Sequence, residues 1–443
     1  MSTENRTFSE PRHAGDRLQE TIRRNRSSET VGVYAVCSAH PWVIAAGARE
    51  SRENRSVLHI ESTSSQVNQF GGYTGQNPEQ FCKFVRQLAR DAGLSHEQIL
   101  LGGDHLGPFP WRSKTASTAM ANAHGLVRAC VLAGYQKIHL DASMACADDH
   151  SLDERTVAHR AAELCATAES AFRELPLDSP PLLYVVGTEV PVPGGESGWQ
   201  ESISVTAATH VESTLDAFKN AFDELGLEDA WERVIGLVVQ PGVEFGENHV
   251  LDYNRRKAQG LRAALPASPK LVYEAHSTDY QLPLSLERMV EDHFAILKVG
   301  PELTFAFREV VFGLSAIEQE MLRGKAARVS TVREALEAAM LRNPSYWRDY
   351  YHGDETQLHI ARCYSYSDRC RYYWHEPEIN EQIDLLIENL TALAPAFTLV
   401  SQYLPLEYAA IRAGRLQASP SEMISHHIRT VLHKYATACG DNR

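Results

Sequence analysis

Eight short apolar runs recur between residues 31 and 300 of this chain, and each of them ends in polar residues. The runs have the length of a strand, are largely β-branched or otherwise apolar, and are closed by Gly, Pro, Asp, Ser or His, which is typical of buried strands. Segments long enough for a helix and two loops separate them. Alternating buried strands and helices predict an α/β fold with a parallel sheet, and eight units predict a (β/α)8 TIM barrel. The runs are 31–38, 57–62, 99–105, 137–143, 182–189, 233–242, 270–276 and 295–300.

The spacing also predicts the helices and a division of the chain. Residues 1–30 are expected to form an N-terminal tail and a short helix, residues 31–325 the barrel, and residues 326–443 a helical C-terminal region. The C-terminal region contains a stretch rich in Tyr, Trp and Arg over 343–374 and is expected to pack over the barrel mouth or to form a partner surface. Helices are predicted over 78–93, 118–134, 154–175, 206–225, 301–322, 329–341 and 377–394.

Composition excludes several classes of function. Hydrophobic residues make up 43% of the 443 residues and charged residues 23%, as in an ordinary soluble globular protein. A formal net charge of -14 disfavours general binding to nucleic acid or to a membrane surface. Residues 1–30 lack the apolar core of a secretory signal, and no apolar run could span a membrane. Eight scattered cysteines without a CxxC pair favour reduced thiols, so a cytoplasmic protein is expected.

Chemistry-bearing side chains follow the predicted strands. In a barrel the strand ends converge, so His105, Glu189 and His276 form a candidate set of metal ligands with open positions for substrate oxygens. The ion would be divalent, with Zn2+ favoured and Mn2+ or Mg2+ as alternatives. Asp104 and Asp141 are candidates for proton transfer. Residues of this kind also cap loops at strand ends, but polar groups at six successive strand ends favour a functional site.

Further polar residues are candidates for binding a substrate. Amide and hydroxyl groups after the second run suit the recognition of sugar hydroxyls, although they would also suit a polar surface loop. Two arginines among aromatic residues could hold a phosphate, or could lie on the surface of a packed helix. The only lysine at a strand end could instead pair with a carboxylate. These candidates are Gln66, Asn68, Gln69, Ser143, Gln240, Glu274, Asp279, Lys298, Arg369 and Arg371.

Two nucleotide-binding motifs are missing from the sequence. There is no GxxxxGK[ST] loop, so a P-loop kinase is unsupported. No GxGxxG follows the first run, which argues against a dinucleotide cofactor. No nucleotide is therefore expected.

At several of these positions the chain resembles the GatZ/KbaZ family. The resemblance extends over nearly the whole chain from about residue 30 onwards. It implies a class II aldolase-like barrel acting in galactitol, tagatose or N-acetylgalactosamine catabolism. Members are described as a D-tagatose-1,6-bisphosphate aldolase class II non-catalytic subunit, as a tagatose-6-phosphate kinase or as a D-tagatose-6-phosphate 4-epimerase. The motifs that carry it are 36–41, 66–75, 102–108, 138–143, 187–195, 239–245, 273–281 and 297–301.

A comparison with the metal ligands of class II aldolases separates these activities. In class II aldolases an Asp-His pair supplies the catalytic acid and the first metal ligand, and Asp104-His105 resembles that pair. The other ligands there are histidines, whereas this chain offers Glu189 and His276, which puts ordinary bisphosphate cleavage in doubt. We therefore expect a metal-dependent D-tagatose 6-phosphate 4-epimerase acting on a ketose 6-phosphate by retro-aldol and aldol steps. The alternatives are a non-catalytic subunit that stabilises an aldolase partner and, third, a kinase; a homo-oligomer is left open.

Overall fold

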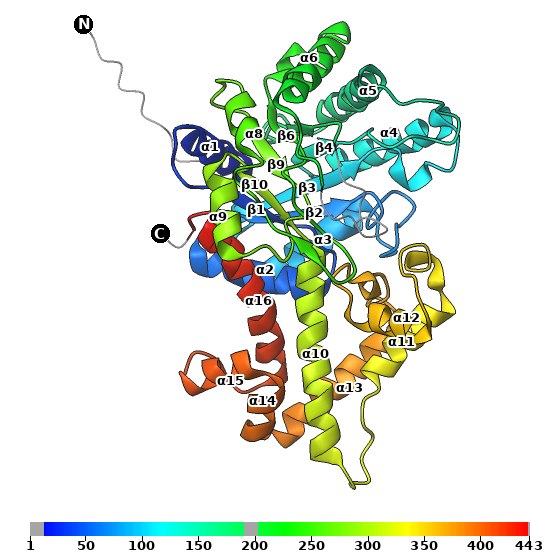
Figure 1. The fold of residues 1–443 in the computed structure, drawn as a ribbon, viewed down its shortest axis with the longest axis vertical. Helices are drawn as coiled ribbons and strands as arrows, with labels where there is room; N and C mark the ends of the chain where they lie inside the picture. Colours follow the sequence, from blue (N-terminus) through cyan, green and yellow to red (C-terminus); the bar gives the residue numbers. More distant parts are fainter. Residues whose placement is uncertain (1–12, 190–202, 442–443) are drawn as a thin grey trace, which may run out of the picture.

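The computed structural model describes residues 13–189 and 203–441, and its centre is a closed barrel of parallel strands (Figure 1). All eight predicted runs contribute one strand each, which confirms the (β/α)8 barrel. A short antiparallel hairpin of β7 (Glu244–Phe245) and β8 (Val250–Leu251), which the sequence did not indicate, follows β6. The barrel strands are β1 (Val33–Val36), β2 (Leu58–Thr63), β3 (Ile99–Leu106), β4 (Lys137–Leu140), β5 (Leu183–Val186), β6 (Val234–Val238), β9 (Val272–Ala275) and β10 (Ile296–Val299).

Helices surround the barrel and begin where local chemistry favours them. Helix α3 (Pro78–Asp91), for example, has Pro at its first position and a capping box in which Asn77 and Gln80 satisfy each other's backbone N–H groups. None of the described helices combines the length and the apolar composition needed to cross a bilayer. The others are α2 (Pro41–Asn54), α4 (Ala116–Ala133), α5 (Glu154–Phe172), α6 (Ala208–Glu224), α7 (Glu228–Trp231), α8 (Gln259–Ala264), α9 (Pro283–Glu291) and α10 (Pro301–Leu322).

Helix α1 (Ala14–Arg26) fills the end of the barrel where the strands begin. Its apolar residues Leu18 and Ile22 are buried against side chains from the barrel interior, among them Leu100 and Leu183. The lower part of the barrel is therefore an apolar core. The rest of the described interior includes buried polar side chains, among them Glu61, Lys137 and Glu274.

The C-terminal region is helical, as predicted. Helices α10 and α16 (Pro420–Ala438) run side by side away from the barrel, and α16 also packs on α2 and α9 (Figure 1). A domain boundary at residue 325 falls between α10 and α11 and stays a prediction, because α16 returns to the barrel. The remaining helices are α11 (Val332–Arg342), α12 (Glu355–Tyr364), α13 (Pro377–Leu393), α14 (Phe397–Tyr403) and α15 (Pro405–Arg412).

Buried polar contacts hold the segment after α12 against the barrel mouth. Asp368 accepts hydrogen bonds from Arg308 Nε (3.0 Å) and from Thr304 Oγ1 (2.7 Å), both on α10. Tyr280, in the loop after β9, donates its hydroxyl to the Tyr366 carbonyl at 2.6 Å. Asp368 has φ 45°, a left-handed conformation that Asp tolerates better than most residues. These contacts place the tyrosine- and arginine-rich segment beside the strand ends.

A charged histidine joins α16 to its neighbours and makes stability depend on pH. His427 Nδ1 lies 3.0 Å from Glu407 Oε1 and Nε2 lies 3.4 Å from Glu309 Oε2. Burial opposes the charged form, but the hydrogen bonds to Glu309 and Glu407 raise the pKa of His427 from 6.5 to about 9. The stabilisation is complete below pH 6.5 and is lost as the pH rises through about 9.

We expect His427→Gln to lower the free energy of unfolding by roughly 2–3 kcal/mol at pH 6, and by much less at pH 9.5. Urea denaturation of both proteins across this pH range measures the difference. His159→Gln is the control, because His159 is a surface residue 3.8 Å from Glu163. A difference between wild type and His427→Gln that stays constant with pH would contradict the assignment.

Candidate functional site

Alternate residues of the strands point into the barrel, and near the strand ends many of them are polar. Side chains at positions i and i+2 of a strand share a face. On β4 this places Lys137 and His139 on the inner face, followed by Asp141 at the strand end. On β9 it does the same for Glu274 and, just beyond the strand, His276. All five side chains are buried.

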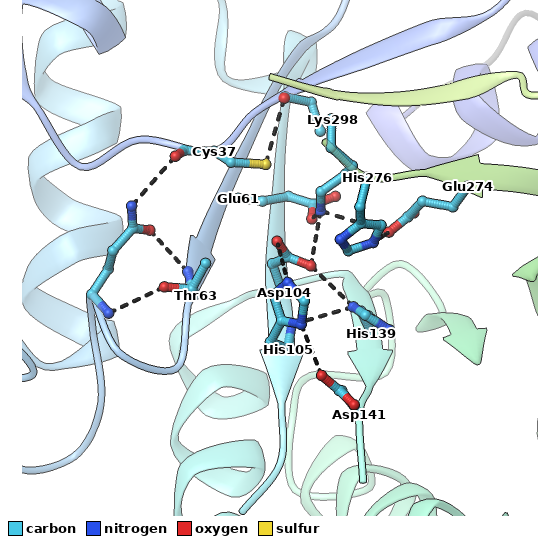
Figure 2. A network of polar contacts seen from close by, with 12 residues as sticks. Cys37, Glu61, Thr63, Asp104, His105, His139, Asp141, Glu274, His276 and Lys298 are labelled. Carbon is cyan, nitrogen blue, oxygen red and sulfur yellow. Dashed lines mark hydrogen bonds and ion pairs between the residues drawn. The ribbon is translucent and has the colours of Figure 1, made fainter. Parts of the chain in front are cut away.

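A buried network of charges lies at the base of this site. Lys137 Nζ is 2.7 Å from Glu61 Oε1 and 2.7 Å from Glu274 Oε2, and all three side chains are fully buried. Lys298 contacts Glu61, and its Nζ lies 3.0 Å from Asp104 Oδ1 (Figure 2). Burial opposes ionisation, but the charges of Lys137 and Lys298 lower the pKa values of Glu61 and Glu274. These carboxylates are therefore ionised at neutral pH.

Three histidine rings meet above this network. The ring centroids of His105, His139 and His276 are 4.9 to 5.3 Å apart. Asp141 Oδ2 holds His105 Nδ1 at 2.8 Å, which turns His105 Nε2 towards Asp104, 3.7 Å away. Burial lowers the pKa of His276 to about 4, so its ring is neutral at pH 7. Neutral imidazole is the form that binds metal ions.

The residues present fit a divalent metal ion. Asp104, His139, Glu274 and His276 each offer a ligand atom, and these atoms all lie within 4.8 Å of one another. The buried Nε2 of His139 has no hydrogen-bond partner among the described residues. Four buried carboxylates (Glu61, Asp104, Asp141, Glu274) lie here with two ammonium groups, so the carboxylates outnumber the lysines. Nitrogen and carboxylate donors together suit Zn2+ or Mn2+.

The predicted ligands agree with this group in part. His276 belongs to it, and His105 lies directly beside it. Glu189 does not belong to it: its carboxylate accepts a hydrogen bond from Thr206 and lies 3.6 Å from His210. His139 and Glu274 belong to the group although the sequence did not lead to either as a ligand, and Glu274 was predicted as a substrate-binding residue. His139 lies two residues before Asp141, and Glu274 lies two residues before His276. Residues at this spacing share a face of a strand, so the alternation could have indicated both.

The structure places the two predicted acid/base residues differently. Asp104 lines the cavity described below, and the charges of His105 and Lys298 lower its pKa well below the usual value although burial opposes this. Asp141 does not line the cavity. Its Oδ1 accepts hydrogen bonds from the Ser143 backbone N–H and hydroxyl, and its Oδ2 faces His105. Asp141 therefore orients His105, and Asp104 faces the substrate space.

A cavity of about 520 Å3 opens above the charged centre. Its walls come from the strand ends, from the loop after β2 and from the segment between α11 and α13. This volume suits a small phosphorylated sugar. Of the predicted substrate residues, the lining includes Gln66, Asn68, Asp279, Lys298, Arg369 and Arg371.

The other predicted substrate residues make structural contacts and do not line this cavity. Gln69 Nε2 donates to the Asn122 carbonyl at 2.9 Å. Gln240 Oε1 accepts from the N–H groups of the loop that follows it. Ser143 binds Asp141, and Glu274 belongs to the charged network below. A polar residue at a strand end can satisfy the adjacent loop, and periodicity does not distinguish that use from ligand binding.

The carboxyl group of Asp279, which lines the cavity, accepts hydrogen bonds from backbone N–H groups. Asp279 Oδ1 accepts hydrogen bonds from the Gly300 and Glu302 N–H groups, both at 2.9 Å, at the start of α10. Burial and the neighbouring Glu302 raise the pKa of Asp279 to about 7. Asp279 thus caps a helix at the edge of the cavity.

Aromatic residues form the part of the wall that sequence reasoning missed. Tyr73 comes from the loop after β2, and its ring lies 4.7 Å from that of Tyr372. Tyr346 stacks on Tyr372 with a centroid distance of 4.8 Å. The Arg369 guanidinium lies 3.0 Å from the Tyr350 ring centroid, a cation–π contact. The tyrosine-rich composition was visible in the sequence, but its docking on the barrel mouth was not.

The fold and the site together define a TIM barrel with a candidate metal centre at its C-terminal mouth. The chain belongs to the D-tagatose-1,6-bisphosphate aldolase subunit GatZ/KbaZ-like family, whose model matches residues 18–440. A solved structure described as a probable tagatose 6 phosphate kinase from Sinorhizobium meliloti 1021 is 42% identical, with a TM-score of 0.85 over 92% of this chain and 100% of that chain.

More distant solved structures match weakly. The YdjI aldolase from Escherichia coli K12 is 10% identical, with a TM-score of 0.42 over 84% of this chain and 96% of that chain. The fructuronate-tagaturonate epimerase UxaE from Cohnella laeviribosi is 11% identical, with a TM-score of 0.46 over 93% of this chain and 82% of that chain.

Proposed function

We propose that the protein is a metal-dependent D-tagatose 6-phosphate 4-epimerase that interconverts this sugar with D-fructose 6-phosphate. The observation that supports this most is the group of metal-ligand donors, of which Asp104 is one, with Lys298 beside it, at the floor of a sugar-sized cavity. Membership of an aldolase-related family supports carbon–carbon bond cleavage as the underlying chemistry. A 4-epimerisation of this kind is a cleavage followed by re-addition.

Of the four donors we assign His139, Glu274 and His276 to the metal and Asp104 to proton transfer. His105, which lies beside this group and is oriented by Asp141, is the proposed fourth ligand. A bound divalent cation would supply Lewis-acid stabilisation of the negative charge that develops on the ketose oxygens as the C3–C4 bond breaks. Glu189 is not carried into this set, and Glu274 takes its place.

Asp104 is the proposed acid and base. Its carboxylate is ionised and lines the cavity, so it can accept the proton of the C4 hydroxyl. The C3–C4 bond then breaks to give a three-carbon enediolate and glyceraldehyde 3-phosphate. After the aldehyde turns its other face, the bond re-forms and Asp104 returns the proton to the C4 oxygen. Lys298, 3.0 Å from Asp104 Oδ1, holds that carboxylate in place.

Epimerisation requires both fragments to stay bound until the bond re-forms. The segment that carries Tyr346, Arg369 and Tyr372 forms one wall of the cavity and separates it from solvent on that side. A covered site retains the reactive enediolate and keeps water away from it.

A second candidate is a non-catalytic subunit that stabilises a class II aldolase catalytic subunit, and the family description favours it. The buried donor group argues against it, since a purely stabilising subunit has no need for this cluster. A kinase is the third candidate. It has the weakest support, because the sequence lacks a P-loop motif for nucleotide phosphates.

The deciding experiment uses the purified full chain with D-tagatose 6-phosphate, Zn2+, Mn2+ or Mg2+, and no ATP, with NMR of the sugar phosphates. We expect D-fructose 6-phosphate to appear, and EDTA or His276→Ala to abolish its formation. His159→Ala, at the surface histidine used above, is the matched control and should be fully active. No turnover with any metal, followed by activation of an added class II aldolase subunit, would favour the second candidate.

A further inference from the structure

A second, smaller cavity adjoins the first. Its volume is about 240 Å3, and it shares Cys37, Gln66, Tyr73, Gly300 and Arg371 with the wall of the larger one. A water molecule occupies about 30 Å3, so a phosphate group with several waters fits. The rest of its lining is Ser38, Ala39, His40, Pro41, Thr74, Gln76, Phe84, Thr304, Trp374, His375 and Asn380.

The charge of this cavity differs from that of the larger one. Asp104 and Asp279 line the larger cavity, whereas no carboxylate is among the described residues that line the smaller one. Arg371 carries the only full charge there, because burial lowers the pKa of His40 to about 3 and also lowers that of His375. The charge of the described lining therefore favours an anion.

The Arg371 guanidinium is held so that one edge stays available. Its Nη1 donates to the Ser367 and Asp368 carbonyls, and its Nη2 lies 3.0 Å from the Tyr372 hydroxyl. These contacts use three of the five guanidinium N–H groups. The Nε–H and the second Nη2–H remain, and they are the parallel pair that binds a phosphate or carboxylate in a bidentate manner.

Two independent features supply further donors. Trp374 is 2% exposed, and its indole Nε1 has no hydrogen-bond partner among the described residues, although a buried indole N–H normally finds one. Helix α2 begins at the cavity wall, with His40 as its N-cap residue, whereas the first N–H groups of α10 are taken by Asp279. The positive end of the α2 dipole therefore lies at this space.

We propose that the smaller cavity is a phosphate subsite, in which Arg371 and the indole of Trp374 bind the phosphate of a sugar phosphate. The carbon chain of the sugar would extend into the larger cavity. Its identification with the 6-phosphate rests on the proposed function, but the binding of a phosphate monoester does not. Arg369 is less suited, because its Nη1 donates to the Tyr346 carbonyl and its guanidinium lies against Tyr350.

The test follows the tryptophan indole signals of the full chain, labelled with nitrogen-15 tryptophan, by NMR. Trp374→Phe identifies the Trp374 signal. We expect glycerol 3-phosphate to shift that signal saturably and glycerol to leave it unchanged. Arg371→Met should weaken the binding of glycerol 3-phosphate at least tenfold, whereas Arg90→Met, at an exposed arginine that contacts Gln87, should not change it.

Equal shifts with glycerol, or unchanged binding in Arg371→Met, would overturn the subsite. If Trp374→Phe does not fold, Arg371→Met still decides, by isothermal titration with glycerol 3-phosphate. These measurements need neither metal nor turnover. Phosphate binding without epimerisation would support the subsite and refute the proposed function. Epimerisation with an unchanged KM in Arg371→Met would support the function and overturn the subsite.

Discussion

Asp104→Asn is expected to reduce epimerisation by about 10²–10⁴-fold while the purified protein keeps its metal. The asparagine preserves the size of the side chain but cannot accept the C4 hydroxyl proton. Turnover measured by NMR, together with metal content measured by elemental analysis, checks both parts. A variant with full metal and full activity would refute the acid/base role, and a variant without metal would assign Asp104 to the ligand set.

The variant Asp141→Asn distinguishes the role of Asp141 from that of Asp104. Asp141 contacts His105 and Ser143 and does not line the cavity, so its loss acts through the orientation of His105. We expect a smaller effect, about 10–100-fold on activity or on metal affinity. A larger loss of activity in Asp141→Asn than in Asp104→Asn, with metal retained in both, would reverse the two roles.

Lys137→Met is expected to lower the free energy of unfolding by about 3–5 kcal/mol. Lys137 is fully buried between Glu61 and Glu274, and its removal leaves Lys298 alone to balance these two carboxylates. Urea denaturation monitored by circular dichroism measures the change. The methionine side chain fills a similar volume, so the decrease in the free energy of unfolding measures the loss of the charge more than a change in packing.

Lys270→Met provides the matched control. Lys270 forms an exposed ion pair with Glu232, and exposed pairs contribute about 0–1 kcal/mol. An equally small effect in Lys137→Met would show that the interior carboxylates do not depend on this lysine. Lys298, which contacts Glu61 and lies 3.6 Å from Glu274, would then be sufficient to keep them ionised.

The barrel could be predicted from sequence because each of its strands is an apolar run closed by polar residues. The run at Lys137 shows both a strand and a polar inner face, and α10 begins and ends at the predicted residues. The convergence of Asp104, His105 and His276 also followed, since strands of one barrel end at the same rim. His139 could have been found from the same alternation, because it lies two residues before Asp141.

Other parts of the site depend on tertiary contacts that local sequence does not encode. Glu189 ends an apolar run of the sequence just as His276 does, and nothing in its neighbourhood indicates that it pairs with Thr206. The position of Arg371 depends on Asp368 and Arg308, which are 60 residues apart in the chain. A contact of that kind is visible only in the folded structure.

The walls of the larger cavity come from two separate parts of the chain. The candidate metal centre is built from barrel strands, while Tyr346, Arg369 and Arg371 come from a segment attached to α10 through Asp368. If the proposed function holds, substitutions in that segment would alter which sugar phosphate is accepted without disturbing the charged centre. Reactivity and selectivity would then be encoded in separate stretches of the gene.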